Sequence, residues 1–276
     1  AHRRLSIIDL SQAGCQPMAD SDGKIRITFN GEIYNFQNVR KELEEKGYCF
    51  HSHTDTEVII NAYREWGTDC LQKLNGMFAF GLYDENRKVV FLARDRLGKK
   101  PLYYSAAPDH GKLVFASEIK AILKDHSISR DIDLQALNHY LTFGFVPDEF
   151  SIFRSVRKLP PAHAMTYHTE SGKKEIWRYW DVPELSGHRR TEEDLLSELE
   201  SLLRDAVKLR MISDVPLGAF LSGGVDSSTI VALMQVQSNR PVKTFTIGFK
   251  EEGYNEAEYA KNIARHLGTD HTELYV

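Results

Sequence analysis

The sequence is poor in cysteine and has no long apolar run, and both absences exclude classes of protein. Its 276 residues include three cysteines, Cys15, Cys49 and Cys70, which lie far apart and outside any CxxC pattern, so no disulfide framework is expected. No apolar run approaches the roughly 20 residues that a membrane-spanning helix needs. The N-terminal stretch AHRRLSIIDL has no signal-peptide pattern, which makes the cytoplasm the expected location.

An excess of one charge is also lacking. The formal net charge is −4, and the composition of 42% hydrophobic and 27% charged residues is ordinary for a globular protein. We therefore expect neither a nucleic-acid nor a membrane partner, and a homodimer is left open. The chain begins with Ala1 rather than methionine and ends at Val276 within an expected strand, which predicts a fragment cut at both ends.

Residues 1–182 are predicted to form an α+β domain. Antiparallel hairpins are indicated by three pairs of apolar segments with polar turns between them. Helices are predicted at 36–46 and 55–66, each followed by a glycine. The remaining expected strands are RLSIIDL and IRITFN, and the hairpins are MFAFGLYD with KVVFLARD, PLYYSAA with KLVFASE, and AHAMTYH with KKEIWRYW.

Residues 191–276 have a different pattern, which predicts an α/β domain with a parallel sheet. A capped amphipathic helix opens at Thr191, and strands then alternate with helices. The expected strands are 215–221, 242–249 and HTELYV, and the expected helices are 226–237 and 256–267, the last with Asn255 as cap and Gly268 as stop. The linker is predicted at 183–190.

The stretch LSGGVDSS, at 221–228, joins an expected strand to an expected helix. A helix N-terminus there favours phosphate, but the lysine of the GxxxxGK[ST] loop is missing. Gly223 and Gly224 would let the backbone approach an anion with positive φ, and Asp226 suits an intervening Mg²⁺. Hydroxyl donors are supplied by Ser222, Ser227 and Ser228. The plainer alternative is a Gly-Ser turn with Asp226 as helix cap.

The motif SGGVDSS resembles the pyrophosphate loop of the ATP pyrophosphatases, and SDVPLGAFLSGGVDSS more narrowly resembles asparagine synthetases. The resemblance implies an ATP-pyrophosphatase or Rossmann-like domain that splits ATP into AMP and pyrophosphate with Mg²⁺ on Asp226. The backbones of Leu221 and Ile247 would flank the adenine. The implied ATP-binding residues are Leu221, Ser222, Gly223, Gly224, Asp226, Ser227, Ser228 and Ile247.

Three motifs of the first half resemble the glutamine pocket of class II amidotransferases: RLSII, NGEIYN and TDTE. That resemblance implies an Ntn-hydrolase-like fold, with antiparallel sheets sandwiched by helices. Arg4 would grip the glutamine carboxylate, Asp55 would pair with its ammonium group, and Asn30 with Gly31 would form an oxyanion hole. The implied glutamine-binding residues are Arg4, Leu5, Ser6, Ile7, Ile8, Asn30, Gly31, Glu32 and Asp55.

Taken singly, each of these residues also has a purely structural explanation. Arg4 alone is typical of a solvated strand charge, Asp55 of a helix first turn, and the Asn-Gly-Glu run of a hairpin turn. The amidotransferase nucleophile is a cysteine at mature position 1. None of the three cysteines matches it, so the chain as given is expected to be inactive.

Together the two motif sets imply an ATP-dependent ligase. It would convert aspartate, glutamine and ATP into asparagine, glutamate, AMP and pyrophosphate, through β-aspartyl-AMP and channelled ammonia. Two alternatives stay open: a related amidotransferase or β-lactam-forming enzyme that acts on another acid, and a non-catalytic module that senses glutamine or ATP.

Overall fold

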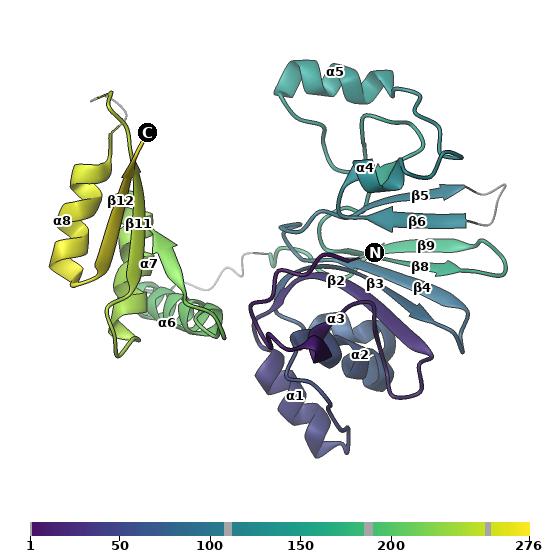
Figure 1. The fold of residues 1–276 in the computed structure, drawn as a ribbon, viewed down its shortest axis with the longest axis horizontal. Helices are drawn as coiled ribbons and strands as arrows, with labels where there is room; N and C mark the ends of the chain where they lie inside the picture. Colours follow the sequence, from purple (N-terminus) through teal and green to yellow (C-terminus); the bar gives the residue numbers. More distant parts are fainter. Residues whose placement is uncertain (1, 108–111, 185–189, 252–254) are drawn as a thin grey trace. The chain divides into compact units, whose positions relative to one another are not determined.

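The computed structural model describes residues 2–107, 112–184, 190–251 and 255–276. The chain divides into two compact units, Ala1–Glu184 and Leu185–Val276 (Figure 1). Each unit has its own sheet and helices, so each is described separately below.

The first unit is built on a six-stranded antiparallel sheet in the order β1-β2-β3-β4-β8-β9. Its strands are β1 (Met18–Ala19), β2 (Ile25–Ile33), β3 (Gly76–Asp84), β4 (Val89–Arg94), β8 (His163–His168) and β9 (Lys174–Arg178). A second antiparallel sheet has the order β6-β5-β7, with β5 (Tyr103–Ala107), β6 (Lys112–Ala116) and β7 (Arg157–Lys158).

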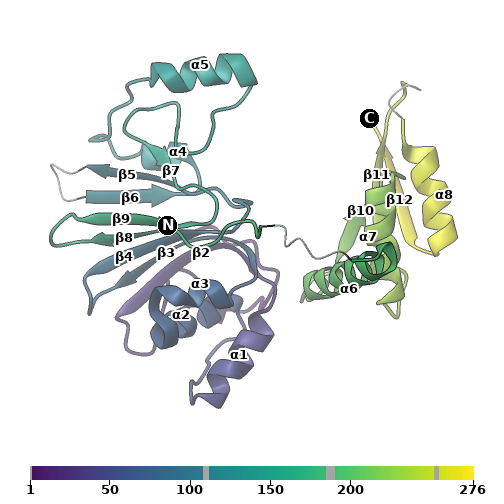
Figure 2. The same ribbon diagram turned by 180° about the vertical axis from the view of Figure 1, so that it is seen from behind.

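Helices cover the face of the main sheet opposite the second sheet (Figures 1 and 2). They are α1 (Phe36–Glu45), α2 (Asp55–Trp66) and α3 (Cys70–Lys73), with short 3₁₀ turns at η1 (Gln12–Gly14) and η2 (Gly67–Asp69). The remaining helices of the unit are α4 (Ile119–Ile122), which packs against β5 and β6, and α5 (Leu134–Phe143).

Successive side chains of a strand point to opposite faces of the main sheet, and apolar side chains pack on both faces. On the helix face, Tyr63 of α2 stacks on Phe91 of β4 with ring centroids 5.7 Å apart. On the opposite face, Leu92 packs with Tyr104 of the second sheet and Met165 of β8. The first unit therefore has two hydrophobic layers, one on each side of the sheet.

The second unit has a parallel sheet in the order β10-β11-β12. Its elements are α6 (Glu192–Arg210), β10 (Gly218–Phe220), α7 (Val225–Val236), β11 (Lys243–Gly248), α8 (Ala257–Leu267) and β12 (Asp270–Tyr275). Thr191 caps α6 by accepting a hydrogen bond from Asp194 N, as predicted, and Gly268 ends α8 in the left-handed conformation.

The predicted strand at RLSIIDL is wrong, because this stretch is irregular. The Arg4 side chain turns back onto the Ile8 carbonyl, and Asp9 has a φ of +53°, so the chain cannot stay extended. β10 is shorter than the predicted 215–221, since Ser213 binds the backbone of Val215 in a turn. The predicted turn at 108–111 and the predicted linker residues 185–189 lie outside the described residues.

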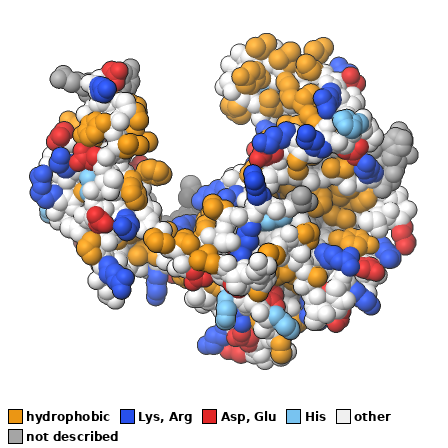
Figure 3. Space-filling view, in the orientation of Figure 1, with side chains coloured by type: hydrophobic (Ala, Val, Ile, Leu, Met, Phe, Trp, Pro, Cys, Tyr) orange, Lys and Arg blue, Asp and Glu red, His pale blue; other side chains and the backbone are white. Residues whose placement is uncertain are grey.

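Apolar side chains gather over α5 (Figure 3). The exposed ones there are Leu134, Tyr140, Leu141, Phe143 and Phe145. A second exposed row follows α6 at Leu195, Leu196, Leu199 and Leu202. Within the described ranges, no helix is long and apolar enough to cross a membrane.

Candidate functional site

A cavity of about 140 Å³ lies at the end of β2, beside the first turn of α2. It brings together three stretches that are far apart in the sequence: the irregular N-terminal segment, the end of β2, and the start of α2. Of the predicted glutamine-binding residues, those that line it are Arg4, Leu5, Ile7, Ile8, Asn30, Gly31, Glu32 and Asp55. Ser6 does not line it.

Asp55 is the most deeply buried charge among the predicted residues, with 6% of its surface exposed. It opens α2, directly after the cap Thr54, and its Oδ2 accepts a hydrogen bond of 3.0 Å from Ile33 N at the end of β2. Burial raises the pKa of the Asp55 carboxyl to about 6, because the charged form is poorly solvated, while the nearby Arg4 opposes the rise. A cationic ligand group would favour the charged form further.

Arg4 supplies positive charge to the lining of the cavity. Its Nη2 donates to Ile8 O at 2.6 Å and its Nη1 to Ser11 O at 3.4 Å. These two bonds hold the guanidinium in place, and its charge lowers the pKa of both Asp9 and Asp55. The cavity therefore has a fixed cation and a buried carboxylate.

Gly31 allows two strands to approach closely at the cavity. Its φ is +151°, and a Cβ at this position would lie 2.1 Å from Met77 O. Any other residue would therefore push β2 away from β3. Asn30, one residue earlier, donates from Nδ2 to Ser117 Oγ at 3.3 Å, and Glu32, one residue later, is buried.

Sequence reasoning missed several residues of the cavity lining, namely His2, Arg3, Gln16, Phe29, Thr56, Met77 and Lys100. Gln16 connects two of the elements, since its Oε1 accepts from Phe29 N at 2.6 Å and its Nε2 donates to Thr56 Oγ1 at 3.4 Å. Such long-range pairs leave no local pattern in the sequence.

Lys100 is held at the cavity by the buried Asp95. The Asp95 carboxylate accepts hydrogen bonds of 2.9–3.1 Å from the backbone N–H groups of Leu97, Lys99, Lys100 and Phe78. The loop after β4 is thereby tied to β3. The run Asp-Arg-Leu-Gly, in which an aspartate precedes a glycine turn, was the available signal for this loop.

The second predicted site, at 221–228, joins β10 to α7. Leu221 is buried beside β11: its N–H donates to Phe245 O at 2.9 Å, and its carbonyl accepts from the Thr246 hydroxyl. Leu221 thus lies directly after β10, beside the part of β11 that carries Ile247, whose side chain is about half exposed. Within the loop, the hydroxyls of Ser222 and Ser227 bond each other at 3.0 Å.

The two loop glycines differ, which corrects the prediction that both take positive φ. Gly223 has a φ of +84°, and a Cβ there would lie 2.7 Å from the Cβ of Tyr259 on α8. Gly224 has a φ of −73° and is the N-cap residue of α7, without any side-chain capping bond. Asp226 lies in the first turn rather than at the cap, so the plain-cap alternative is wrong.

The first turn of α7 carries the Ser228 hydroxyl and the Asp226 carboxylate. The Ser228 hydroxyl is buried without a hydrogen-bond partner in the described part of the chain, which is costly unless a ligand satisfies it. Asp226 is exposed. No group of three metal-ligating side chains occurs among the described residues. A lone carboxylate suits Mg²⁺ whose other ligands are phosphate oxygens and water.

Comparison with known families matches both units. The family model described as a glutamine amidotransferase domain matches residues 1–180, and the model described as asparagine synthase matches residues 198–276. Asparagine synthetase [glutamine-hydrolyzing] 3 of Bacillus subtilis is 39% identical over 259 residues, which cover 91% of this chain and 41% of that protein. A putative asparagine synthetase of Methanocaldococcus jannaschii is 37% identical, over 99% of this chain and 55% of that protein.

Among solved structures, the glutamine phosphoribosylpyrophosphate amidotransferase of B. subtilis aligns with 95% of this chain and 49% of its own, at 16% identity and a TM-score of 0.43. The chain spans about half or less of the length of the two synthetases it matches. The chain belongs to the glutamine amidotransferase family, and its residues 198–276 match the asparagine synthase model.

Proposed function

We propose that the intact protein makes asparagine from aspartate, glutamine, ATP and water, and releases glutamate, AMP and pyrophosphate. Ammonia is set free from glutamine in the first unit. ATP activates aspartate as β-aspartyl-AMP in the domain to which the second unit belongs, and ammonia then attacks the acyl carbon. Passing ammonia within the protein protects it from protonation by water.

The observation that carries the proposal is the meeting of residues 4, 5, 7, 8, 30–32 and 55 at one cavity. Glutamine has a carboxylate, an ammonium group and a side-chain amide. The fixed Arg4 guanidinium suits the carboxylate, and the buried Asp55 carboxylate suits the ammonium group. Asn30 Nδ2 and the Gly31 N–H would stabilise the oxyanion that forms when the amide is attacked. Leu5, Ser6, Ile7, Ile8 and Glu32 would complete the glutamine site.

The loop at 221–228 is the proposed ATP site. The backbones of Leu221 and Ile247 would flank the adenine, and Ser222, Gly223, Gly224, Ser227 and Ser228 would hold the phosphates at the start of α7. The unpartnered Ser228 hydroxyl supports this role, because a phosphate oxygen would satisfy it. Asp226 would hold Mg²⁺, which neutralises charge on the pyrophosphate leaving group.

Replacing Arg4 by alanine should impair the use of glutamine but not of ammonia. Losing a two-pronged charge-assisted pair costs about 2–4 kcal/mol, roughly a 30- to 1000-fold loss in kcat/KM for glutamine. Asparagine formation from ammonium salts should stay near wild type in the intact enzyme. Arg26→Ala is the matched control, since Arg26 is exposed and forms a surface ion pair with Glu85 at 3.8 Å. An equal loss with both nitrogen donors would make Arg4 a purely structural residue.

Replacing Asp55 by asparagine should stabilise the glutamine-free domain while abolishing glutamine use. The folded-state pKa of about 6 lies above the ordinary 3.8, so the folded state binds the proton more tightly. Stability therefore falls as pH rises from about 4 to about 6, by about 3 kcal/mol in total. Asparagine has no charge to bury, yet its amide oxygen can still accept from Ile33 N.

Urea unfolding at about pH 4 and about pH 7.5 measures this effect. The two proteins should differ little at the lower pH, and Asp55→Asn should be the more stable at the higher pH. A variant that is less stable at both values would show that the Asp55 charge is already stabilised without glutamine.

Replacing Asp226 by asparagine should weaken the Mg²⁺ dependence of pyrophosphate release. The neutral amide is a poorer ligand for a hard cation, so we expect the Mg²⁺ concentration for half-maximal release to rise about tenfold or more. Pyrophosphate is measured in the intact enzyme with ATP and aspartate. Asp205→Asn, on the exposed side of α6, serves as control. Unchanged release in the Asp226 variant would remove this residue from the site.

A further inference from the structure

The segment that carries Arg4 has no regular secondary structure. Residues 2–10 lie in neither a helix nor a strand, so no ladder of backbone hydrogen bonds fixes them. Side-chain contacts must therefore hold Arg4 at the cavity. One is made by His2, whose Nε2 lies 2.9 Å from Phe29 O of β2.

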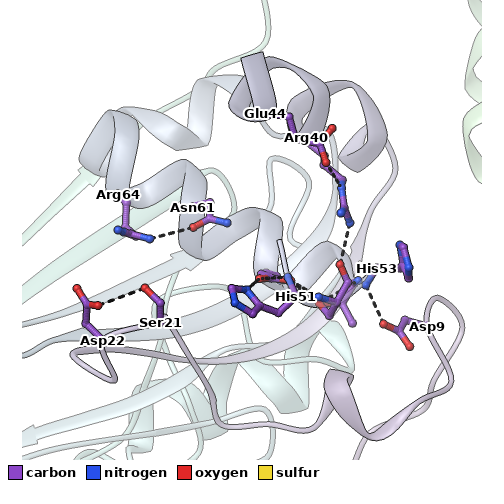
Figure 4. A network of polar contacts seen from close by, with 12 residues as sticks. Asp9, Ser21, Asp22, Arg40, Glu44, His51, His53, Asn61 and Arg64 are labelled. Atoms are coloured by element: carbon purple, nitrogen blue, oxygen red, sulfur yellow. Dashed lines mark hydrogen bonds and ion pairs between the residues drawn. The ribbon is translucent and has the colours of Figure 1, made fainter. Parts of the chain in front are cut away.

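The Asp9 carboxylate joins this segment to the start of α2. One oxygen, Oδ1, accepts from Ser11 N at 3.0 Å and from Ser11 Oγ at 2.6 Å, both within the segment. The other, Oδ2, accepts from His53 N at 2.8 Å, 44 residues away in the sequence. Figure 4 shows Asp9 directed toward the backbone at His53.

The partner segment around His53 is rigid. The Glu57 carboxylate accepts hydrogen bonds from His51 N, Ser52 N and Ser52 Oγ at 2.6–3.1 Å, and Thr54 caps α2 through Glu57 N. The Thr54 hydroxyl thus caps the helix, and the Glu57 carboxylate ties the two residues before His53 to its first turn, which fixes the entry of the helix. Since Asp55 directly follows Thr54, the Asp9–His53 bond links the Arg4 segment to the backbone that positions Asp55.

The Asp9 backbone has a rare conformation, with φ at +53° and only 9% of the residue exposed. Non-glycine residues keep such a conformation only where the surroundings enforce it. The bonds from the Ser11 hydroxyl and the His53 N–H lower the pKa of the carboxyl, so it is charged at neutral pH. Arg4 bonds to the carbonyls of Ile8 and Ser11, on either side of Asp9.

We propose that Asp9 is a positioning residue that sets the distance between the two charged groups of the glutamine pocket, Arg4 and Asp55. It does not line the cavity itself. The inference rests on the proposed use of glutamine, whose carboxylate and ammonium group are a fixed distance apart. A shift of the Asp9 turn would move Arg4 while Asp55 stayed in place.

The test compares Asp9→Asn and Asp9→Ala in the intact enzyme. Asparagine keeps the preference for positive φ. Its single amide oxygen can replace only one of the two carboxylate oxygens, and its NH₂ group cannot accept the other hydrogen bond, from either His53 N or Ser11 N. We expect KM for glutamine to rise about 10-fold in Asp9→Asn and further in Asp9→Ala, with little change in ammonia-dependent asparagine formation. Asp22→Ala is the control, because Asp22 is exposed and accepts a hydrogen bond from its neighbour Ser21 (Figure 4).

A double-mutant cycle with Arg4→Ala separates positioning from general destabilisation. If Asp9 acts through Arg4, Asp9→Ala should add little to the glutamine KM of Arg4→Ala, because the group it positions is gone. Full additivity, or an equal loss with ammonia, would overturn the inference. A wild-type protein that forms asparagine from neither glutamine nor ammonia would instead overturn the proposed function, so the two failures are distinguishable.

Discussion

Burial of the Asp55 carboxylate between β2 and α2 disfavours its charged form, and this penalty outweighs the groups that oppose it. The backbone N–H groups of Ile33, Thr56 and Asp55 itself and, more weakly, the charge of Arg4 favour the carboxylate. The ligand-free cavity is therefore left with a carboxylate that is easily protonated. A ligand with an ammonium group would remove this penalty, so binding and the charge state of Asp55 are coupled.

The structure around the cavity holds Arg4 and the backbone N–H donors in place near that carboxylate. Gly31 brings β2 close to β3, and Asp95 collects four backbone N–H groups so that the loop carrying Lys100 stays at the cavity. Asp9 does the same for the segment carrying Arg4. Gly31 thus acts within a strand pair, whereas the two aspartates fix irregular backbone that no strand or helix holds; together they keep the cavity preformed.

Regular elements could be predicted wherever local signals agree. The helix at 55–66 is predicted from its residue pattern and from Gly67, which ends it, and the hairpins because apolar strands flank polar turns. The α5 helix was missed although Asp133 caps it and Gly144 ends it. The strand predicted at RLSIIDL failed because its apolar alternation was overridden by the Arg4 and Asp9 side chains, which bond within the segment.

The motif residues of the cavity could be named from the sequence, but their supports could not. Asp9 with His53 and Gln16 with Thr56 are contacts across about 40 residues, and nothing in either local sequence requires the other. In the loop at 221–228, the sequence predicted two equivalent glycines. Of the two, Gly223 alone takes positive φ, and it alone lies against α8, which is a tertiary contact that the loop sequence does not encode.

The central claim is that Asp55 receives the ammonium group of glutamine. Carbon NMR of the Asp55 carboxyl, titrated with and without saturating glutamine, tests it most directly. The account predicts a pKa of about 6 in the free protein and a fall of about two pH units or more when glutamine is bound. An Asp55 pKa that does not change when glutamine binds would contradict the account, because the ammonium group would then lie elsewhere.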